Sequence, residues 1–203
     1  MNIIQILLPV YLVVFYGATI FWRSYRVRKA TGVNPYRLSA REYQRDDVHG
    51  LVSRLFRITL VSPALVVLIY TFAPRAYMYL APIAWLQTPF VTAAGLLLLA
   101  VALIWVLVAQ WHMGDSWRIG IDGENTAPLV THGVFGWSRN PIFLGMRVML
   151  IGLFLVLPNA LTLALWWLGD VLMQVQVYLE EKHLAQQHGT VYETYRQRVR
   201  RWI

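Results

Sequence analysis

Five long apolar stretches dominate this chain of 203 residues and restrict what it can fold into. They cover residues 3–22, 55–73, 90–111, 141–157 and 160–178, and each is close to the roughly 17–25 residues that an α-helix needs to cross a bilayer. Hydrophobic residues make up 58% of the chain and charged residues 14%, whereas a soluble domain is about half apolar and roughly a quarter charged. The sequence therefore predicts an all-α, polytopic integral membrane protein with about five transmembrane helices.

The basic residues predict the orientation of these helices. Between the first two stretches a basic segment carries only three acidic residues, and the tail is also basic, so the positive-inside rule places both in the cytoplasm. The basic residues are Arg23, Arg26, Arg28, Lys29, Arg37, Arg41, Arg45 and Arg54 in the first segment, and Lys182, Arg196, Arg198, Arg200 and Arg201 in the tail. We expect a multi-pass protein of a bacterial inner membrane, with its amino terminus outside and its carboxy terminus in the cytoplasm. The net charge of +8 then reflects topology and contacts with membrane lipids, and not nucleic-acid binding.

A single membrane domain over residues 1–203 accounts for the whole chain. Residues 1–111 would form three helices and the basic loop, and residues 112–203 a polar loop, a helical hairpin and the tail. The first stretch lacks the basic leader and cleavage pattern of a signal peptide, so we expect it to remain as a helix. Because the chain contains no cysteine, disulfides, thiolate zinc sites and cysteine nucleophiles are excluded.

The sequence Leu157-Pro158-Asn159-Ala160 leaves almost no linker between the last two apolar stretches. Proline and asparagine favour a tight turn, so these stretches should form an antiparallel hairpin. Its open ends must be neighbours, which predicts that Arg139 lies near Glu180 and Glu181.

A glycine-punctuated loop leads into this hairpin. Thr131, His132 and Gly133 precede Phe135-Gly136, and Asn140-Pro141 starts a helix whose free N–H groups suit an anionic ligand group. A capped helix with Arg139 reaching lipid phosphate is the alternative.

Two features of the tail complete the predicted site. Glu180-Glu181 should end the fifth helix, where the dipole disfavours anions and a cationic partner is needed; a solvated edge is the alternative. Residues 180–203 should form an interfacial helix, bent near Gly189. Its apolar side would carry Tyr192, Tyr195, Val199 and Trp202.

Polar residues within the apolar stretches also need an explanation, because such groups rarely face lipid. Gln110, Asp170, Gln174 and Gln176 should each face a cavity or a polar partner. Asp170 and Gln174, one turn apart, could line a substrate passage or make hydrogen bonds between helices. The histidines, His49, His112, His132, His183 and His188, have no metal-site spacing, so no metal is expected.

Two ordered patterns, GVFGWSRNPIFLG and EEKHLAQQHGTVYETYRQRV, resemble those of the isoprenylcysteine carboxyl methyltransferase and phospholipid methyltransferase superfamily. The matching positions are Gly133, Phe135, Arg139, Pro141, Phe143 and Gly145 in the first pattern, and Glu180, Glu181, Leu184, Gly189, Tyr192, Tyr195 and Arg201 in the second. The chain departs from the family where Asn140 replaces a histidine and Phe143 a frequent tyrosine. Asparagine cannot shuttle a proton at neutral pH, so a role of that histidine as acid or base would be lost here.

The resemblance implies an S-adenosylmethionine pocket at the cytoplasmic edge, capped by the loop and the tail. Its cofactor-binding residues would be Thr131, His132, Gly133, Phe135, Arg139, Asn140, Pro141, Phe143, Glu180, Glu181, Tyr192 and Tyr195. Arg139 and Glu181 would be the catalytic pair, and Gln110, Asp170 and Gln174 would contact a lipophilic acceptor that enters from the bilayer. That acceptor could be a carboxylate, as in isoprenylcysteine, or an amine, phenol or thiol. The competing hypotheses are an NADPH-dependent reductase of the sterol-reductase type and a membrane scaffold without enzymatic activity.

Overall fold

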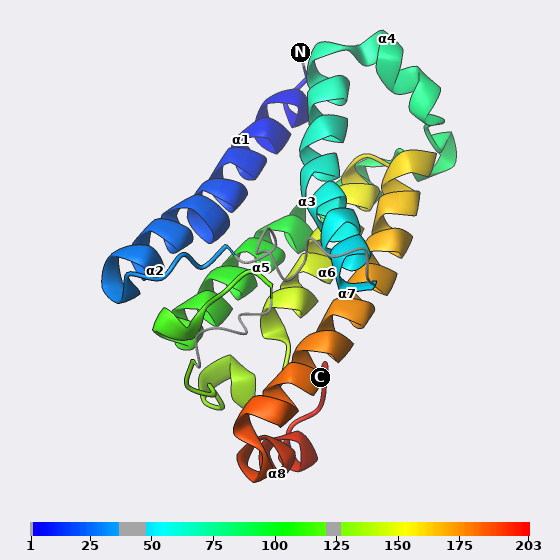
Figure 1. Cartoon of the computed structure of the whole chain (residues 1–203). Helices are drawn as coiled ribbons and strands as arrows, with labels where there is room; N and C mark the ends of the chain where they lie inside the picture. The colour runs from blue at the N-terminus through cyan, green and yellow to red at the C-terminus, as the bar shows by residue number, and fades with distance from the viewer. Residues whose placement is uncertain (1, 37–47, 121–126) are drawn as a thin grey trace.

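The computed structural model describes residues 2–36, 48–120 and 127–203, and every regular element in these ranges is helical (Figure 1). The elements are α1 (Ile4–Tyr16), the π-helical turn η1 (Gly17–Trp22), α2 (Arg23–Thr31), α3 (Val48–Phe72), α4 (Pro74–Tyr77), the 3-10 turns η3 (Met78–Leu80) and η4 (Ala84–Leu86), α5 (Pro89–Met113), η5 (Gly114–Ser116), η6 (Gly133–Gly136), α6 (Pro141–Val156), α7 (Ala160–His188) and α8 (Thr190–Arg198). In the described residues, four helical segments are long and apolar enough to cross a membrane: Ile4–Thr31, Gly50–Phe72, Pro89–Ser116 and Ala160–His188. The predicted all-α membrane class is confirmed.

The helix α6, predicted as a span, is the short member of the bundle. Its 16 residues extend about 24 Å, less than the roughly 30 Å of a hydrocarbon core. It packs closely on α5, where Gly95 and Gly152 bring the two backbones together, and Gly169 of α7 faces Leu150 on its other side. Small residues at crossings of this kind let membrane helices pack tightly without a hydrophobic driving force.

The first helix is longer than its apolar stretch predicted. It continues through η1 and α2 to Thr31 and ends at Gly32, whose φ of +72° terminates a helix without steric cost. The basic residues from Arg23 to Lys29 are therefore helical and not part of a loop, because polarity alone does not stop a helix. Arg54 lies on α3.

Several residues of the predicted basic loop lie outside the described part of the chain. They are Arg37, Arg41 and Arg45 with the acidic Glu42, Asp46 and Asp47, and the side chain of His49 also falls outside it.

The predicted hairpin is confirmed. The helix α6 ends at Val156 and α7 begins at Ala160, with Asn159 as its N-cap. The Asn159 Oδ1 accepts a hydrogen bond from the Thr162 backbone N–H at 3.0 Å, and the Thr162 hydroxyl accepts one from the Asn159 N–H at 3.3 Å. This reciprocal cap fixes the start of α7. The open ends of the hairpin consequently lie at the opposite end of the bundle from α4, beside α8 (Figure 1).

The helix α7 also runs beyond its predicted end. It continues to His188 and stops at Gly189, where φ is +52°. The break near Gly189 agrees with the prediction, whereas residues 180–188 belong to α7 and not to a tail helix. Glu180 and Glu181 therefore lie about two turns inside α7, so the argument that placed them at an unfavourable helix end is wrong.

Candidate functional site

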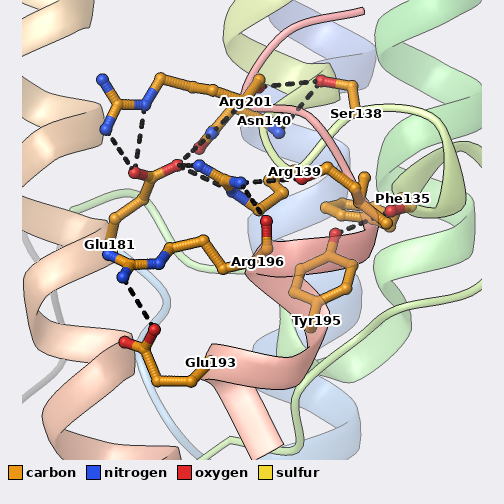
Figure 2. Close-up of polar contacts among 10 residues, drawn as sticks. Phe135, Ser138, Arg139, Asn140, Glu181, Glu193, Tyr195, Arg196 and Arg201 are labelled. Atoms are coloured by element: carbon orange, nitrogen blue, oxygen red, sulfur yellow. Dashed lines mark hydrogen bonds and ion pairs between the residues drawn. The ribbon is translucent and has the colours of Figure 1, made fainter.

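Glu181 is the centre of a buried polar cluster that joins the hairpin to the carboxy-terminal segment (Figure 2). Its Oε1 accepts hydrogen bonds from Nε and Nη2 of Arg139, at 3.1 and 3.0 Å, and from Nδ2 of Asn140 at 3.1 Å. Its Oε2 accepts two from Arg201, at 3.1 and 2.7 Å. The predicted proximity of Arg139 and Glu181 is confirmed, and the carboxylate is held by two guanidinium groups from different parts of the chain.

The guanidinium of Arg139 donates most of its hydrogen bonds to other groups of the protein. Besides Glu181 it binds the backbone carbonyls of Arg196 and Val199 through Nη1, at 3.0 and 2.7 Å. Four of its five N–H groups therefore have protein partners. Arg139 fastens the segment after α8 to the start of α6, which is a positioning role.

Further hydrogen bonds attach the same segment to residues 135–140. The backbone N–H of Arg139 donates to the carbonyl of Arg200 at 3.0 Å, and the hydroxyl of Ser138 donates to the carbonyl of Arg201 at 3.2 Å. The Tyr195 hydroxyl donates to the carbonyl of Phe135 at 2.7 Å. These bonds hold α8 and the residues after it, together called the lid below, across the open end of the hairpin (Figure 2).

A cavity with a volume of about 220 Å³ lies behind α8. Its wall is built by α1, η1, α3, α5, η6, α6, α7 and α8, with residues 116–120, 127–130 and 139–140. The inner part is apolar, with Phe15, Phe56, Leu60 and Met146 in its lining. The same four side chains also line a smaller cavity deeper in the bundle, so hydrophobic space continues between the helices.

One face of α7 supplies a polar wall to the cavity. Gln176, Glu180, His183 and Gln187 follow one another at intervals of four, three and four residues, which places them along one side of the helix over about 16 Å. This surface, called the α7 polar stripe below, contains the ionisable residues Glu180 and His183.

Two buried polar atoms in the lining have no partner among the described residues. The Gln176 amide donates from Nε2 to the Glu180 carboxylate at 2.9 Å, which leaves Gln176 Oε1 unpaired, and the Tyr192 hydroxyl is also unpaired. Burial raises the pKa of Tyr192 to about 12, so its hydroxyl keeps its proton at neutral pH. Because an unsatisfied buried polar group costs free energy, such atoms indicate a site that a polar ligand can complete.

Nine of the predicted site residues contribute to the lining. They are Gln110, Phe135, Arg139, Asn140, Pro141, Phe143, Glu180, Tyr192 and Tyr195. Gln110 also donates to the Thr19 carbonyl at 2.8 Å, within the π-helical turn η1, and so joins α5 to the first helix. Glu181 does not line the cavity, because both its oxygens face the arginines and Asn140.

Thr131, His132 and Gly133, predicted to bind the cofactor, lie on the exposed side of the loop and do not line the cavity. The His132 ring packs edge-on against His112, with 6.2 Å between ring centroids. Gly133 has a φ of +61°, and a Cβ there would lie 2.3 Å from the His112 ring. The glycine therefore permits close packing against a histidine of α5.

Asp170 and Gln174, predicted to contact the acceptor, are also absent from the lining. The Asp170 carboxylate accepts hydrogen bonds from Nε of Arg147 on α6 and from Gln174 at 2.7 Å. The Arg147 guanidinium in turn lies 4.4 Å from the centroid of the Trp202 ring. The alternative interpretation, hydrogen bonding between helices, describes Asp170, because a carboxylate within an apolar helix is stabilised by a charged partner. Gln174 bonds to Asp170 within α7 itself.

Gln176, His183 and Gln187 line the cavity although sequence reasoning assigned them no site role. Their spacing of four, three and seven residues from Glu180 was a usable signal, because it places them on one helical face. Arg201 matched the family pattern, but its bond to Glu181 depends on the return of the chain after Gly189, for which local sequence contains no signal.

Comparisons with known proteins agree with this architecture. The family model described as Phospholipid methyltransferase matches residues 90–191, half of the chain. A protein named protein-S-isoprenylcysteine O-methyltransferase, from Tribolium castaneum, is 37% identical over 72 residues, which cover 35% of this chain and 26% of that protein. The aligned part thus spans about a quarter of the relative. The family match includes α5, α6, α7 and the start of α8, which supply the polar wall and part of the lid, and the chain belongs to the phospholipid methyltransferase family.

Proposed function

We propose that this protein transfers a methyl group from S-adenosylmethionine to a lipophilic small molecule. The observation that carries the proposal is a cavity with two different ends, one bounded by the α7 polar stripe and Tyr192, the other by apolar side chains of α1, α3 and α6. Membership of a methyltransferase family supports the reaction type. An acceptor that partitions into the bilayer suits the apolar end.

The chemistry of the lining fits the cofactor. S-adenosylmethionine carries an ammonium group, a carboxylate, ribose hydroxyls and a sulfonium. Glu180 would bind the ammonium or the hydroxyls, the unpaired Gln176 Oε1 can accept a hydrogen bond, and the unpaired Tyr192 hydroxyl can donate one. The rings of Phe135 and Phe143 are also in the lining and can attract a cation.

The protein would accelerate the reaction chiefly by holding the two reactants in the correct relative position. When bound, the cofactor supplies an electrophilic methyl group, and the transfer gains from alignment of the two reactants and from exclusion of water. The segment held by Arg139 and Glu181 covers the cavity with Tyr192 and Tyr195. In this proposal Arg139 and Glu181 position the lid, in place of the catalytic role predicted for them.

The basic helix α2 supports a cytoplasmic location for the polar end of the cavity. Arg23 at its start donates a hydrogen bond to the Gly114 carbonyl in η5, and residues 116–120 of the lining follow directly. A basic segment next to the cavity mouth favours the cytoplasmic side, where the soluble cofactor is available.

Titration calorimetry of the purified protein with S-adenosylhomocysteine and with NADPH tests the cofactor. We expect binding of S-adenosylhomocysteine alone, because NADPH is a polyanion and would place phosphates beside the Glu180 carboxylate. Binding of NADPH without S-adenosylhomocysteine would contradict the proposal. A labelled-methyl assay against a membrane lipid extract, read by mass spectrometry, would then identify the acceptor.

Replacement of Glu180 by glutamine should weaken S-adenosylhomocysteine binding about tenfold, because a charge-assisted hydrogen bond to the ligand is lost. Calorimetry measures the change in Kd. Glu193→Gln is the matched control, since Glu193 forms a surface pair with Arg196 and is not in the lining. Equal affinity of the Glu180→Gln and Glu193→Gln proteins would exclude Glu180 from the binding site.

A further inference from the structure

The segment between α3 and α5, residues 73–88, lies at the end of the bundle opposite α8 (Figure 1). It contains α4 and the turns η3 and η4, and it is called the α3–α5 connection below. We infer that this connection is embedded in the lipid interface, between the head groups and the acyl chains, and does not stand in water. Its partner is the membrane leaflet on the side away from the lid. The inference concerns how the protein sits in the bilayer and does not depend on the proposed reaction.

Large apolar side chains cover the exposed surface of the α3–α5 connection. Met78, Tyr79 and Trp85 are 66%, 90% and 78% exposed. Phe72 and Phe90, at the adjoining ends of α3 and α5, are 73% and 84% exposed. Such a patch is unusual on a surface that faces water, whereas tyrosine and tryptophan are enriched where a protein meets lipid head groups. The patch continues directly into two helices that are apolar enough to cross a membrane, so lipid is the partner that covers both.

The charge of the α3–α5 connection fits the same location. Arg75 is the only charged residue in positions 72–90, whereas roughly a quarter of the residues in a soluble domain are charged. Arg75 is exposed on α4. At an interface, an arginine side chain keeps its methylene groups in apolar surroundings and extends its guanidinium to the head-group phosphates. The single charge is therefore of the kind that an interfacial segment accommodates.

The short length of α6 provides an independent argument about depth. The helix begins beside Glu181, in the charged cluster at the polar end of the hairpin. Its 16 residues extend about 24 Å, which is about 6 Å less than the thickness of a hydrocarbon core. The turn at Pro158 and Asn159 therefore lies below the far membrane surface, where water does not reach its polar groups. Irregular backbone at such a depth is tolerated only where protein surrounds it.

The α3–α5 connection supplies the partners that this turn needs. The backbone N–H of Ile83 donates to the Pro158 carbonyl at 2.8 Å, and the first backbone N–H of α7 donates to the Ala81 carbonyl at 3.2 Å. The fully buried side chain of Asn159 donates from Nδ2 to the Tyr77 hydroxyl at 3.3 Å. These bonds hold the connection at the depth of the turn. The connection therefore shields the turn on its inner side and presents its aromatic rings to lipid on its outer side.

Fluorophores on single cysteines measure this depth, and the chain contains no cysteine that would interfere. The protein is placed in phosphatidylcholine nanodiscs and carries an environment-sensitive label on Tyr79→Cys or Trp85→Cys. Lipids with a spin label near the head group should quench these labels at least about twice as strongly as a label on Gln186→Cys, because an interfacial segment lies among the head groups. Iodide in the water should quench them less than it quenches the label on Gln186→Cys.

Two reference positions calibrate the measurement. Gln186 is exposed and lies about 39 Å along α7 from Ala160, which places it beyond the hydrocarbon core. Val101, exposed at the middle of α5, should respond most to lipids labelled deep in the acyl chain. Labels at Tyr79 and Trp85 that iodide reaches as easily as the label at Gln186 would overturn the inference. Labels shielded from both quenchers would also overturn it, because a second copy of the chain and not lipid would then cover the patch.

Photo-crosslinking tests the same point in the unmodified protein, so it does not depend on how a variant folds. A phosphatidylcholine that carries a diazirine close to its head group should modify residues 78–88. Mass spectrometry would find this modification in the tryptic peptide that follows Arg75. Crosslinks on α5 without any in residues 78–88 would overturn the inference and leave the proposed function standing, because neither result concerns the binding of S-adenosylhomocysteine.

Discussion

Replacement of Glu181 by glutamine should lower the free energy of unfolding by about 3–5 kcal/mol and abolish binding of S-adenosylhomocysteine. The side chains of Glu181 and Arg139 are each only 9% exposed, so the change leaves a buried guanidinium without its counter-ion. Arg201 is 43% exposed, and water can replace most of its bond to Glu181. Denaturant unfolding measures the stability, and limited trypsin digestion reports release of the arginine-rich segment after α8.

A surface ion pair provides the control for Glu181. In this pair the distance from Glu193 Oε2 to Arg196 Nη2 is 2.8 Å, and the two side chains are 41% and 53% exposed, respectively. Glu193→Gln should therefore cost less than about 1 kcal/mol and leave the segment protected from trypsin. If Glu181→Gln were as stable and as resistant as Glu193→Gln, the buried cluster would not be what holds the lid.

The parts of the fold that could be predicted depend on short-range rules. Leu157 to Ala160 contain too few residues for anything but a tight turn, and this requirement alone placed Arg139 beside Glu181. The helix break near Gly189 could be predicted in the same way, because glycine adopts a positive φ at little cost. Apolar length predicted the existence of the helices.

The parts that could not be predicted depend on long-range contacts. Helix ends were misplaced because hydrophobicity marks where a helix is apolar and not where it stops, so α7 continues ten residues beyond Tyr178. The pairing of Asp170 with Arg147 could not be predicted, because a partner on the facing helix can be identified only once the register of α6 and α7 is known. The packing of His112 against Gly133 could not be predicted, because nothing in the local sequence indicates it.

Substitution of alanine for Gly95 should destabilise the bundle by about 2–3 kcal/mol, because α5 and α6 leave no space for a methyl group at their crossing. A Cβ at Gly95 would lie 2.8 Å from the carbonyl oxygen of Gly152 and 2.8 Å from the backbone nitrogen of Val156. Both atoms belong to the backbone of α6, so a rotamer change cannot relieve the clash and the helices must separate. Because the first residues of α6 line the cavity, the affinity for S-adenosylhomocysteine should also fall. Thermal unfolding and calorimetry of the purified protein measure the two effects.

Gly17 offers the matched control for this crossing. It is also helical, with a φ of −58°, but a Cβ there would meet nothing within 4 Å. Gly17→Ala should therefore leave stability unchanged or raise it by up to about 1 kcal/mol, since alanine loses less conformational entropy on folding. The contrast separates steric exclusion at the α5–α6 crossing from the general preference of helices for alanine. A Gly95→Ala protein as stable as Gly17→Ala would show that the two helices can move apart without cost, and that close packing at Gly95 and Gly152 does not position α6 against the cavity.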